Sequence, residues 1–123
     1  MTGGVHFASI AAGYDHTCGI VSGGAAYCWG LNLAGQLATG SYSPDISSAP
    51  LPVAGGLAFT TLAAGSQHTC GLVSDSTAYC WGANDFGMLG DSTTTSRNAP
   101  AAVAGGLRFA AITTRNYHTC GSP

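Results

Sequence analysis

The chain has 123 residues, the size of one small domain, and a formal net charge of -2 at pH 7. Only 7% of its residues are charged, against about 25% in a typical soluble domain, and the sequence contains neither Glu nor Lys. The charge balance disfavours nucleic-acid binding, the lack of two strong helix formers disfavours a helical bundle, and no apolar run approaches the ~20 residues of a membrane-spanning helix.

Repeat units follow one another along the chain, over residues 5–56, 57–106 and, in part, 107–123. The first 26 residues of the first two units are identical at 15 positions. Repeat proteins normally carry atypical capping units at their ends, and none is visible here. We therefore expect residues 1–123 to be one partial repeat domain from a longer array. No secretory signal peptide is recognisable.

Each unit is predicted to contain short β-strands. In the second unit, apolar runs over 59–64, 68–73 and 77–81 are separated by Gly65 and by the polar turn 74–76. A polar loop then leads toward Pro100. Short strands at this spacing, in units of about 50 residues, are typical of an all-β sheet and of a propeller blade. No segment shows a helical apolar period.

The turn at 74–76 fixes a hairpin register. Counting outward from a three-residue loop places Cys70 opposite Cys80, and the same count in the first unit places Cys18 opposite Cys28. Directly opposed residues of an antiparallel pair lie close enough for a disulfide.

Five cysteines allow three interpretations. Two intrablade disulfides, Cys18–Cys28 and Cys70–Cys80, would leave Cys120 as an unpaired thiol. Free buried thiols are the second interpretation, and a metal site including His16 is the third, although the tight Cys pairs of zinc sites are absent from the sequence. The register favours the disulfides, which persist outside the cytosol. We therefore predict no metal site and no cofactor.

The remaining repeated side chains are interpreted as structural. The histidines at 16, 68 and 118 occupy one position of every unit, whereas an active site needs a unique constellation, so we expect each to hydrogen-bond backbone within its own blade. We expect Trp29 and Trp81 to pack between blades. The five aspartates are expected in turns. We predict no catalytic residue and no enzyme activity.

Three motifs recur in order: His-Thr-Cys-Gly, Tyr-Cys-Trp-Gly, and Asn-x-x-Gly-x-Leu. Together they resemble the regulator of chromosome condensation repeat, in the cysteine-bearing form of secreted or surface-associated bacterial proteins. The resemblance covers nearly all of residues 5–123. It implies antiparallel four-stranded blades of a β-propeller, and hence an all-β, incomplete propeller of about two and a third blades.

The function expected from these features is a non-enzymatic scaffold that binds an unknown protein partner, outside the cell or on its surface. Loops 39–49 and 91–99 differ between the units, and partners are expected there because loops tolerate variation. Self-association through the open propeller ends is a further expectation. The eukaryotic relatives imply an alternative, guanine-nucleotide exchange or regulation, and an accessory propeller of a longer multidomain enzyme is a second one.

Overall fold

The computed structural model describes residues 6–40, 43–85, 87–105, 108–115 and 118–122. Over these residues the regular structure is all β, and every strand pairing is antiparallel. The first unit forms one four-stranded sheet in the order β1-β2-β3-β4. Its strands are β1 (Phe7–Ala12), β2 (His16–Val21), β3 (Ala26–Asn32) and β4 (Ser43–Pro52).

The second unit repeats this sheet, and the third unit begins it again. The second sheet has the order β5-β6-β7-β8, and β9 pairs with β10 in a two-stranded sheet. The strands are β5 (Phe59–Ala64), β6 (His68–Val73), β7 (Ala78–Gly82), β8 (Arg97–Ala102), β9 (Ala111–Arg115) and β10 (His118–Ser122). Strands expected over 59–64 and 68–73 are confirmed, and the one expected over 77–81 lies one residue further on.

The hairpin register predicted from the turn at 74–76 is confirmed. Cys70 pairs with Cys80 across β6 and β7, and Cys18 pairs with Cys28 across β2 and β3. The turn is closed by the backbone N–H of Val73, which donates to the carbonyl of Thr77 over 3.1 Å. A three-residue loop therefore sets the partner of every residue in both strands.

Each outer strand replaces part of a predicted loop. Residues 43–49 of the expected loop 39–49 belong to β4, and residues 97–99 of the expected loop 91–99 belong to β8. Asp45, expected in a turn, consequently lies in a strand. The sequence signal was weak because these strands contain prolines, which sheets accept only at an edge. β4 and β8 are the edge strands that satisfy this condition.

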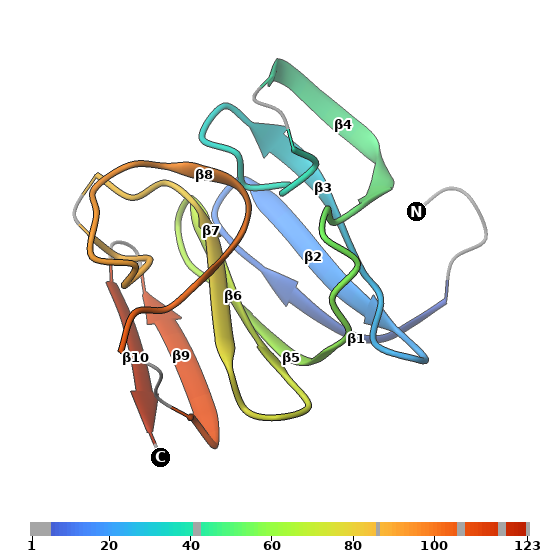
Figure 1. Ribbon diagram of the computed structural model, residues 1–123. Coiled ribbons are helices and arrows are strands. Elements are labelled where there is room, and N and C mark those ends of the chain that lie inside the picture. Colours follow the sequence, from blue (N-terminus) through green and yellow to red (C-terminus); the bar gives the residue numbers. More distant parts are fainter. Residues whose placement is uncertain (1–5, 41–42, 86, 106–107, 116–117, 123) are drawn as a thin grey trace.

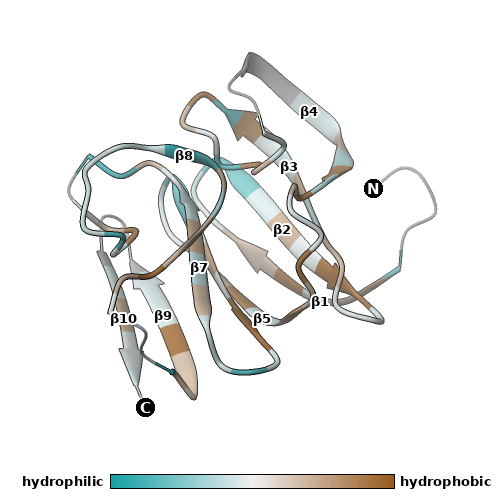
Figure 2. Cartoon of the chain, viewed as in Figure 1, coloured by the Kyte–Doolittle hydropathy of each residue, from teal (hydrophilic) through white to brown (hydrophobic). Residues whose placement is uncertain are grey.

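The sheets stack side by side as blades (Figure 1). β5 lies against β1 and β2, and β9 lies against β5 and β6. Hydrophobic residues follow the strands, with strongly hydrophobic segments on β2, β5 and β9, whereas several of the connecting loops are hydrophilic (Figure 2). One cluster of buried side chains spans both blades, joining Ile20 and Leu37 of the first unit to Phe59 and Trp81 of the second. Because neither sheet covers its own apolar face, each blade needs its neighbour.

A search of the described ranges for a helix that is both long and apolar enough to cross a membrane finds none.

Candidate functional site

The cysteine pairs lie in the middle of the blades. The structure joins Cys18 to Cys28 and Cys70 to Cys80 by disulfides. All four are at most 1% exposed, so neither bridge is open to a substrate or to solvent. Cys120 on β10 is an exposed free thiol. Nowhere in the described part of the chain do three or more His, Cys, Asp or Glu side chains gather as metal ligands.

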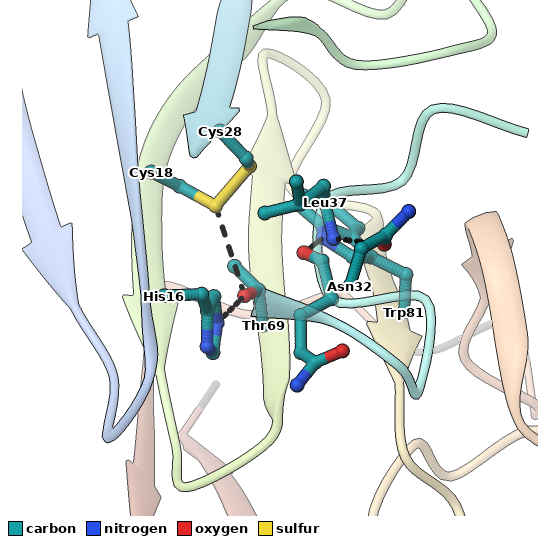
Figure 3. The surroundings of a disulfide bond; sticks show 8 residues. His16, Cys18, Cys28, Asn32, Leu37, Thr69 and Trp81 are labelled. Carbon is teal, nitrogen blue, oxygen red and sulfur yellow. Dashed lines mark hydrogen bonds between the residues drawn. A yellow bond between two sulfur atoms is a disulfide. The ribbon is translucent and has the colours of Figure 1, made fainter. Parts of the chain in front are cut away.

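A hydrogen bond between histidine and threonine joins each blade to the next. His16 Nε2 lies 2.7 Å from Thr69 Oγ1, and the sulfur of Cys18 lies 3.8 Å from the same hydroxyl. Figure 3 shows His16 and Cys18, both from β2, pointing toward Thr69 on β6. The arrangement recurs one unit later, where His68 Nε2 lies 2.9 Å from Thr119 Oγ1. The same motif thus supplies the histidine of one contact and the threonine of the other.

The expectation that each histidine bonds backbone within its own blade is therefore wrong for His16 and His68. The strand backbone there is already used in the sheet ladder, as the pairings of β2 and β6 show. The ring nitrogen reaches the side chain of the following blade instead. The side chain of His118 lies outside the described residues.

Burial fixes the charge of His16. His16 is 3% exposed, and its burial, together with the nearby His68, lowers the pKa of His16 to about 4. The ring is thus neutral at neutral pH. A threonine hydroxyl beside a neutral imidazole resembles a nucleophile with its base, but Thr69 is fully buried. The pair holds two blades together and is closed to any substrate.

Removing the Thr69 hydroxyl will weaken this contact. We expect Thr69→Val to lower the free energy of unfolding by about 1–3 kcal/mol, the usual cost of leaving a buried polar group without its partner. The matched control is Thr17→Val. Thr17 has the same place in the motif of the first unit but is only half-buried. Chemical denaturation of both variants makes the comparison, and equal losses would contradict the assignment.

Trp81 also lies in the contact between the first and second blades, which we call the seam. Its indole Nε1–H donates to the carbonyl of Gln36 over 2.9 Å, and its side chain is fully buried. It packs with Leu37 and Ala38 of the first unit and with Phe59. The prediction that Trp81 packs between blades is confirmed. Trp29 is only half-buried, and the described ring that it contacts is Phe7 of its own blade, 5.3 Å between centroids.

Self-association was expected at the open propeller ends, where apolar side chains are uncovered. The apolar side chains of the first and second units differ in how far they are exposed. In the second unit Phe59 is 3% exposed, because the first blade covers it. In the first unit the equivalent face includes Ile10, which is 58% exposed. An apolar surface on this side is consequently a feature of the first blade.

The asparagine of the Asn-x-x-Gly-x-Leu motif has a structural role that was not predicted from the sequence. The structure shows that Asn32 Oδ1 accepts the backbone N–H of Leu37 over 3.1 Å. Asn84 Oδ1 accepts that of Leu89 over 3.0 Å. Both asparagines are buried. Each holds the turn that presents the motif leucine to the interior, and the recurrence of Asn at a fixed distance before Leu was the available signal.

Asn84 also organises the loop that follows. Its Nδ2 lies within 3.2 Å of the carboxylate of Asp91, of the hydroxyl and carbonyl of Thr93, and of the carbonyl of Thr95. Asp91 in turn accepts a hydrogen bond from Arg97 Nε at 2.8 Å. A buried amide and an ion pair therefore fix the path of residues 91–97.

Asp91 remains ionised in acid because of this network. Burial would raise the pKa of Asp91, but hydrogen bonds from Thr93, Arg97 and Asn84 outweigh it and lower the pKa to about 2. The Asp91 side chain is only 6% exposed, whereas that of Arg97 is 39% exposed. Ser92, Thr94 and Thr95 of the same loop are exposed. The loop thus presents small hydroxyl side chains on a rigid base.

Comparison with known proteins gives matches over nearly the whole chain. Models of the regulator of chromosome condensation (RCC1) repeat match residues 23–72 and 75–121, and a second model of this repeat matches 7–36 and 59–87. The ultraviolet-B receptor UVR8 of Arabidopsis thaliana is 33% identical over 72% of this chain and 20% of its own length. The chain therefore spans about a fifth of that relative.

Solved structures share the fold. Yeast RCC1 (Prp20), in its complex with Kap60, has a TM-score of 0.79 at 21% identity, over 94% of this chain and 30% of that one. The ectodomain of the receptor kinase CR4 of Physcomitrella patens has a TM-score of 0.60 at 26% identity, over 98% of this chain and 27% of that one. The present chain spans less than a third of each of these two structures.

Proposed function

Because the chain belongs to the regulator of chromosome condensation (RCC1) repeat family, we propose that it is a non-enzymatic, protein-binding segment of a β-propeller that acts outside the cell or on its surface. The observation that carries the proposal is a contrast between blades and loops. The two blades repeat the same strands and motifs, whereas loops 39–49 and 91–99 differ between the units. The repeated His, Thr, Cys and Trp side chains are used for holding the blades, as the seam around Thr69 and Trp81 shows.

The proposed binding surface is the end of the blades that carries loop 91–97. Asn84, Asp91 and Arg97 hold this loop in one conformation, and a preorganised loop loses little conformational entropy on binding. Its exposed residues are short hydroxyl side chains, which suit hydrogen bonding to a protein surface. Yeast RCC1 (Prp20), which shares this fold, is bound by Kap60, and this supports a protein-binding role for the present chain.

The extracellular part of the proposal is supported by the cysteines. Each blade encloses one disulfide, and disulfides persist in oxidising compartments but are rare in the cytosol. The likeness to a receptor-kinase ectodomain points the same way.

The oxidation state of the cysteines is a prediction that can be measured directly. Non-reduced protein recovered from its own compartment and alkylated should contain Cys18 linked to Cys28, Cys70 linked to Cys80, and only Cys120 modified. Mass spectrometry of the peptides makes the assignment. Modification of all five cysteines in freshly recovered protein would remove the support for an extracellular site.

Photo-crosslinking tests the binding surface. A benzophenone amino acid is placed at exposed Thr94 in the rigid loop and, as the control, at exposed Ser22 in the opposite β2–β3 hairpin. The protein is then incubated with intact cells of the source organism. We expect a discrete cross-linked protein from position 94 and none from position 22. Equal labelling at both positions, or none at either, would contradict the proposal. Nucleotide release from a small GTPase is measured in parallel and should remain at its spontaneous rate.

A further inference from the structure

A pocket lies between the turns of successive units, at the end of the blades that also carries loop 91–97 (Figure 1). The turn between β1 and β2 contributes Gly13 and Tyr14, the turn between β5 and β6 contributes Gly65 and Ser66, and β9 contributes Thr114. The volume of the pocket is about 280 Å³, just below the usual range of about 300–1,000 Å³ for small-molecule sites. A ligand of one ring is therefore the size that it accommodates.

The two turns are joined backbone to backbone. The N–H of Gly13 donates to the carbonyl of His16 over 2.8 Å and closes the first turn, and the N–H of Tyr14 donates to the carbonyl of Ser66 in the second turn over 3.3 Å. A Cβ added to Gly13 would collide with the carbonyl oxygen of Gly65, so only glycine lets the turns approach so closely. The shape of the pocket is thus set before any ligand binds, which lowers the entropic cost of binding.

The side chain of Tyr14 is not needed to form this turn. It is 81% exposed, and it has no hydrogen bond or ring contact within the described ranges. The second unit has Ser66 at the equivalent position, and its turn closes in the same way, from the N–H of Gly65 to the carbonyl of His68 over 2.7 Å. Ser66 has neighbouring units on both sides, since β5 contacts β1 and β9, and it is still only half-buried. The position is therefore open between blades, and the tyrosine ring there is free to meet a ligand.

Two hydroxyl groups line the pocket together with this ring. They belong to Ser66 and Thr114, and neither makes a hydrogen bond within the part of the chain that the structure describes. The described lining contains no charged residue. A charged ligand would lose hydration here without gaining an opposite charge. The pocket consequently favours a neutral ligand that carries its own hydrogen-bonding groups.

We propose that this pocket binds one ring of a neutral sugar. The C–H groups on the face of a pyranose ring are slightly positive, and they fit the negative face of the Tyr14 ring. The sugar hydroxyls exchange hydrogen bonds with the hydroxyls of Ser66 and Thr114. A purely apolar ligand would leave these two hydroxyls unmatched, and an open-chain polyol has no face to place on the tyrosine. The proposal does not depend on the protein-binding function of loop 91–97.

Titration of the whole chain with simple glycosides tests the site. The probes are the methyl β-glycosides of glucose, galactose, mannose and N-acetylglucosamine, and binding is followed by the backbone amide shifts in nuclear magnetic resonance spectra. With at least one probe, we expect shifts concentrated at Gly13, Tyr14, Gly65 and Ser66. The dissociation constant should be about 1 mM, as is usual for a ligand of this size. Sorbitol, which has the hydroxyls of glucose but no ring, is the control ligand and should leave these amides unchanged.

The variant Tyr14→Ser removes the ring without disturbing the turn, because serine is the residue of the second unit at this position. We expect it to weaken sugar binding about tenfold, whereas Tyr14→Phe should bind as the unaltered chain does. The matched control is Leu33→Ser. Leu33 is another large apolar side chain, 61% exposed, but it does not line the pocket, so its replacement should leave the affinity unchanged.

Three results would overturn the proposal: no shift at these amides with any of the glycosides, equal shifts with sorbitol, or undiminished affinity in Tyr14→Ser. An oligosaccharide of the preferred sugar then separates two sources of the same ligand. Tighter binding of the oligosaccharide would support a ring that belongs to a glycan, and equal binding would support a free sugar.

Discussion

Replacing Trp81 with alanine is expected to lower the free energy of unfolding by about 3–5 kcal/mol, the usual cost of truncating a large buried aromatic side chain. The side chain is fully buried in the cluster shared by both blades. Its loss also leaves the carbonyl of Gln36 without its indole donor. Small domains are stable by only about 5–15 kcal/mol, so this loss is a large fraction of the total and should shift the urea midpoint well below that of the unaltered protein. Urea denaturation followed by far-ultraviolet circular dichroism measures the effect.

Trp29→Ala is the matched control. Trp29 has the same neighbours in sequence and the same place in its strand, but it is half-buried and packs on Phe7 of its own blade. Its replacement should cost roughly 1–2 kcal/mol, in proportion to the smaller apolar area that it buries. If both variants lost the same stability, the seam between the blades would not be the main source of the effect.

Mild acid should destabilise the protein through His16. The pKa of this side chain is about 4 in the folded protein because of burial and the nearby His68, whereas it is near 6.5 in an unfolded chain. The unfolded state therefore binds more protons between these two values. The contribution of neutral His16 to the free energy of unfolding is fully present above pH 6.5. It falls by about 3 kcal/mol as the pH is lowered to 4. Urea midpoints at several pH values give the slope.

His16→Gln separates this effect from other titrations. Glutamine retains a hydrogen-bonding side chain but does not take up a proton in this range. The variant should therefore lose stability less steeply between pH 6.5 and 4, by about one proton in the linkage slope. Asp91 does not contribute to this slope, because its pKa is lowered to about 2. The stabilisation that ionised Asp91 provides is therefore lost only below pH 4. An unchanged slope in the variant would show that His16 is not the responsible group.

The strands and their register could be predicted because the information is local. Turn 74–76 and the alternation of apolar residues determine which residues of β6 and β7 face one another, and this brought Cys70 opposite Cys80. The outer strands could be placed only from the family resemblance. β8 contains Arg97, Asn98, Pro100 and three alanines, and nothing in its own sequence distinguishes an edge strand from a loop.

The contacts between units could not be predicted in the same way. His16 and Thr69 are 53 residues apart, and their meeting depends on how one sheet is rotated and shifted against the next. The repeat shows that the two residues occupy neighbouring positions of one motif, but it does not show that adjacent units share them. The network of Asn84, Asp91 and Arg97 was missed for a related reason, because it depends on how loop 91–97 folds back over a buried asparagine.

The seam also bears on the time at which each blade matures during synthesis. Thr69 is made 53 residues after His16, which at about 5–20 residues per second is a delay of roughly 3–10 seconds. The last strand of the first blade ends at Pro52, so in the final part of this interval the blade has its strands and its cysteines but neither the hydroxyl that receives His16 nor Trp81. Each blade therefore becomes complete one unit behind the ribosome. A pause in translation between residues 57 and 69 would prolong the exposure of its apolar face to chaperones and to other nascent chains.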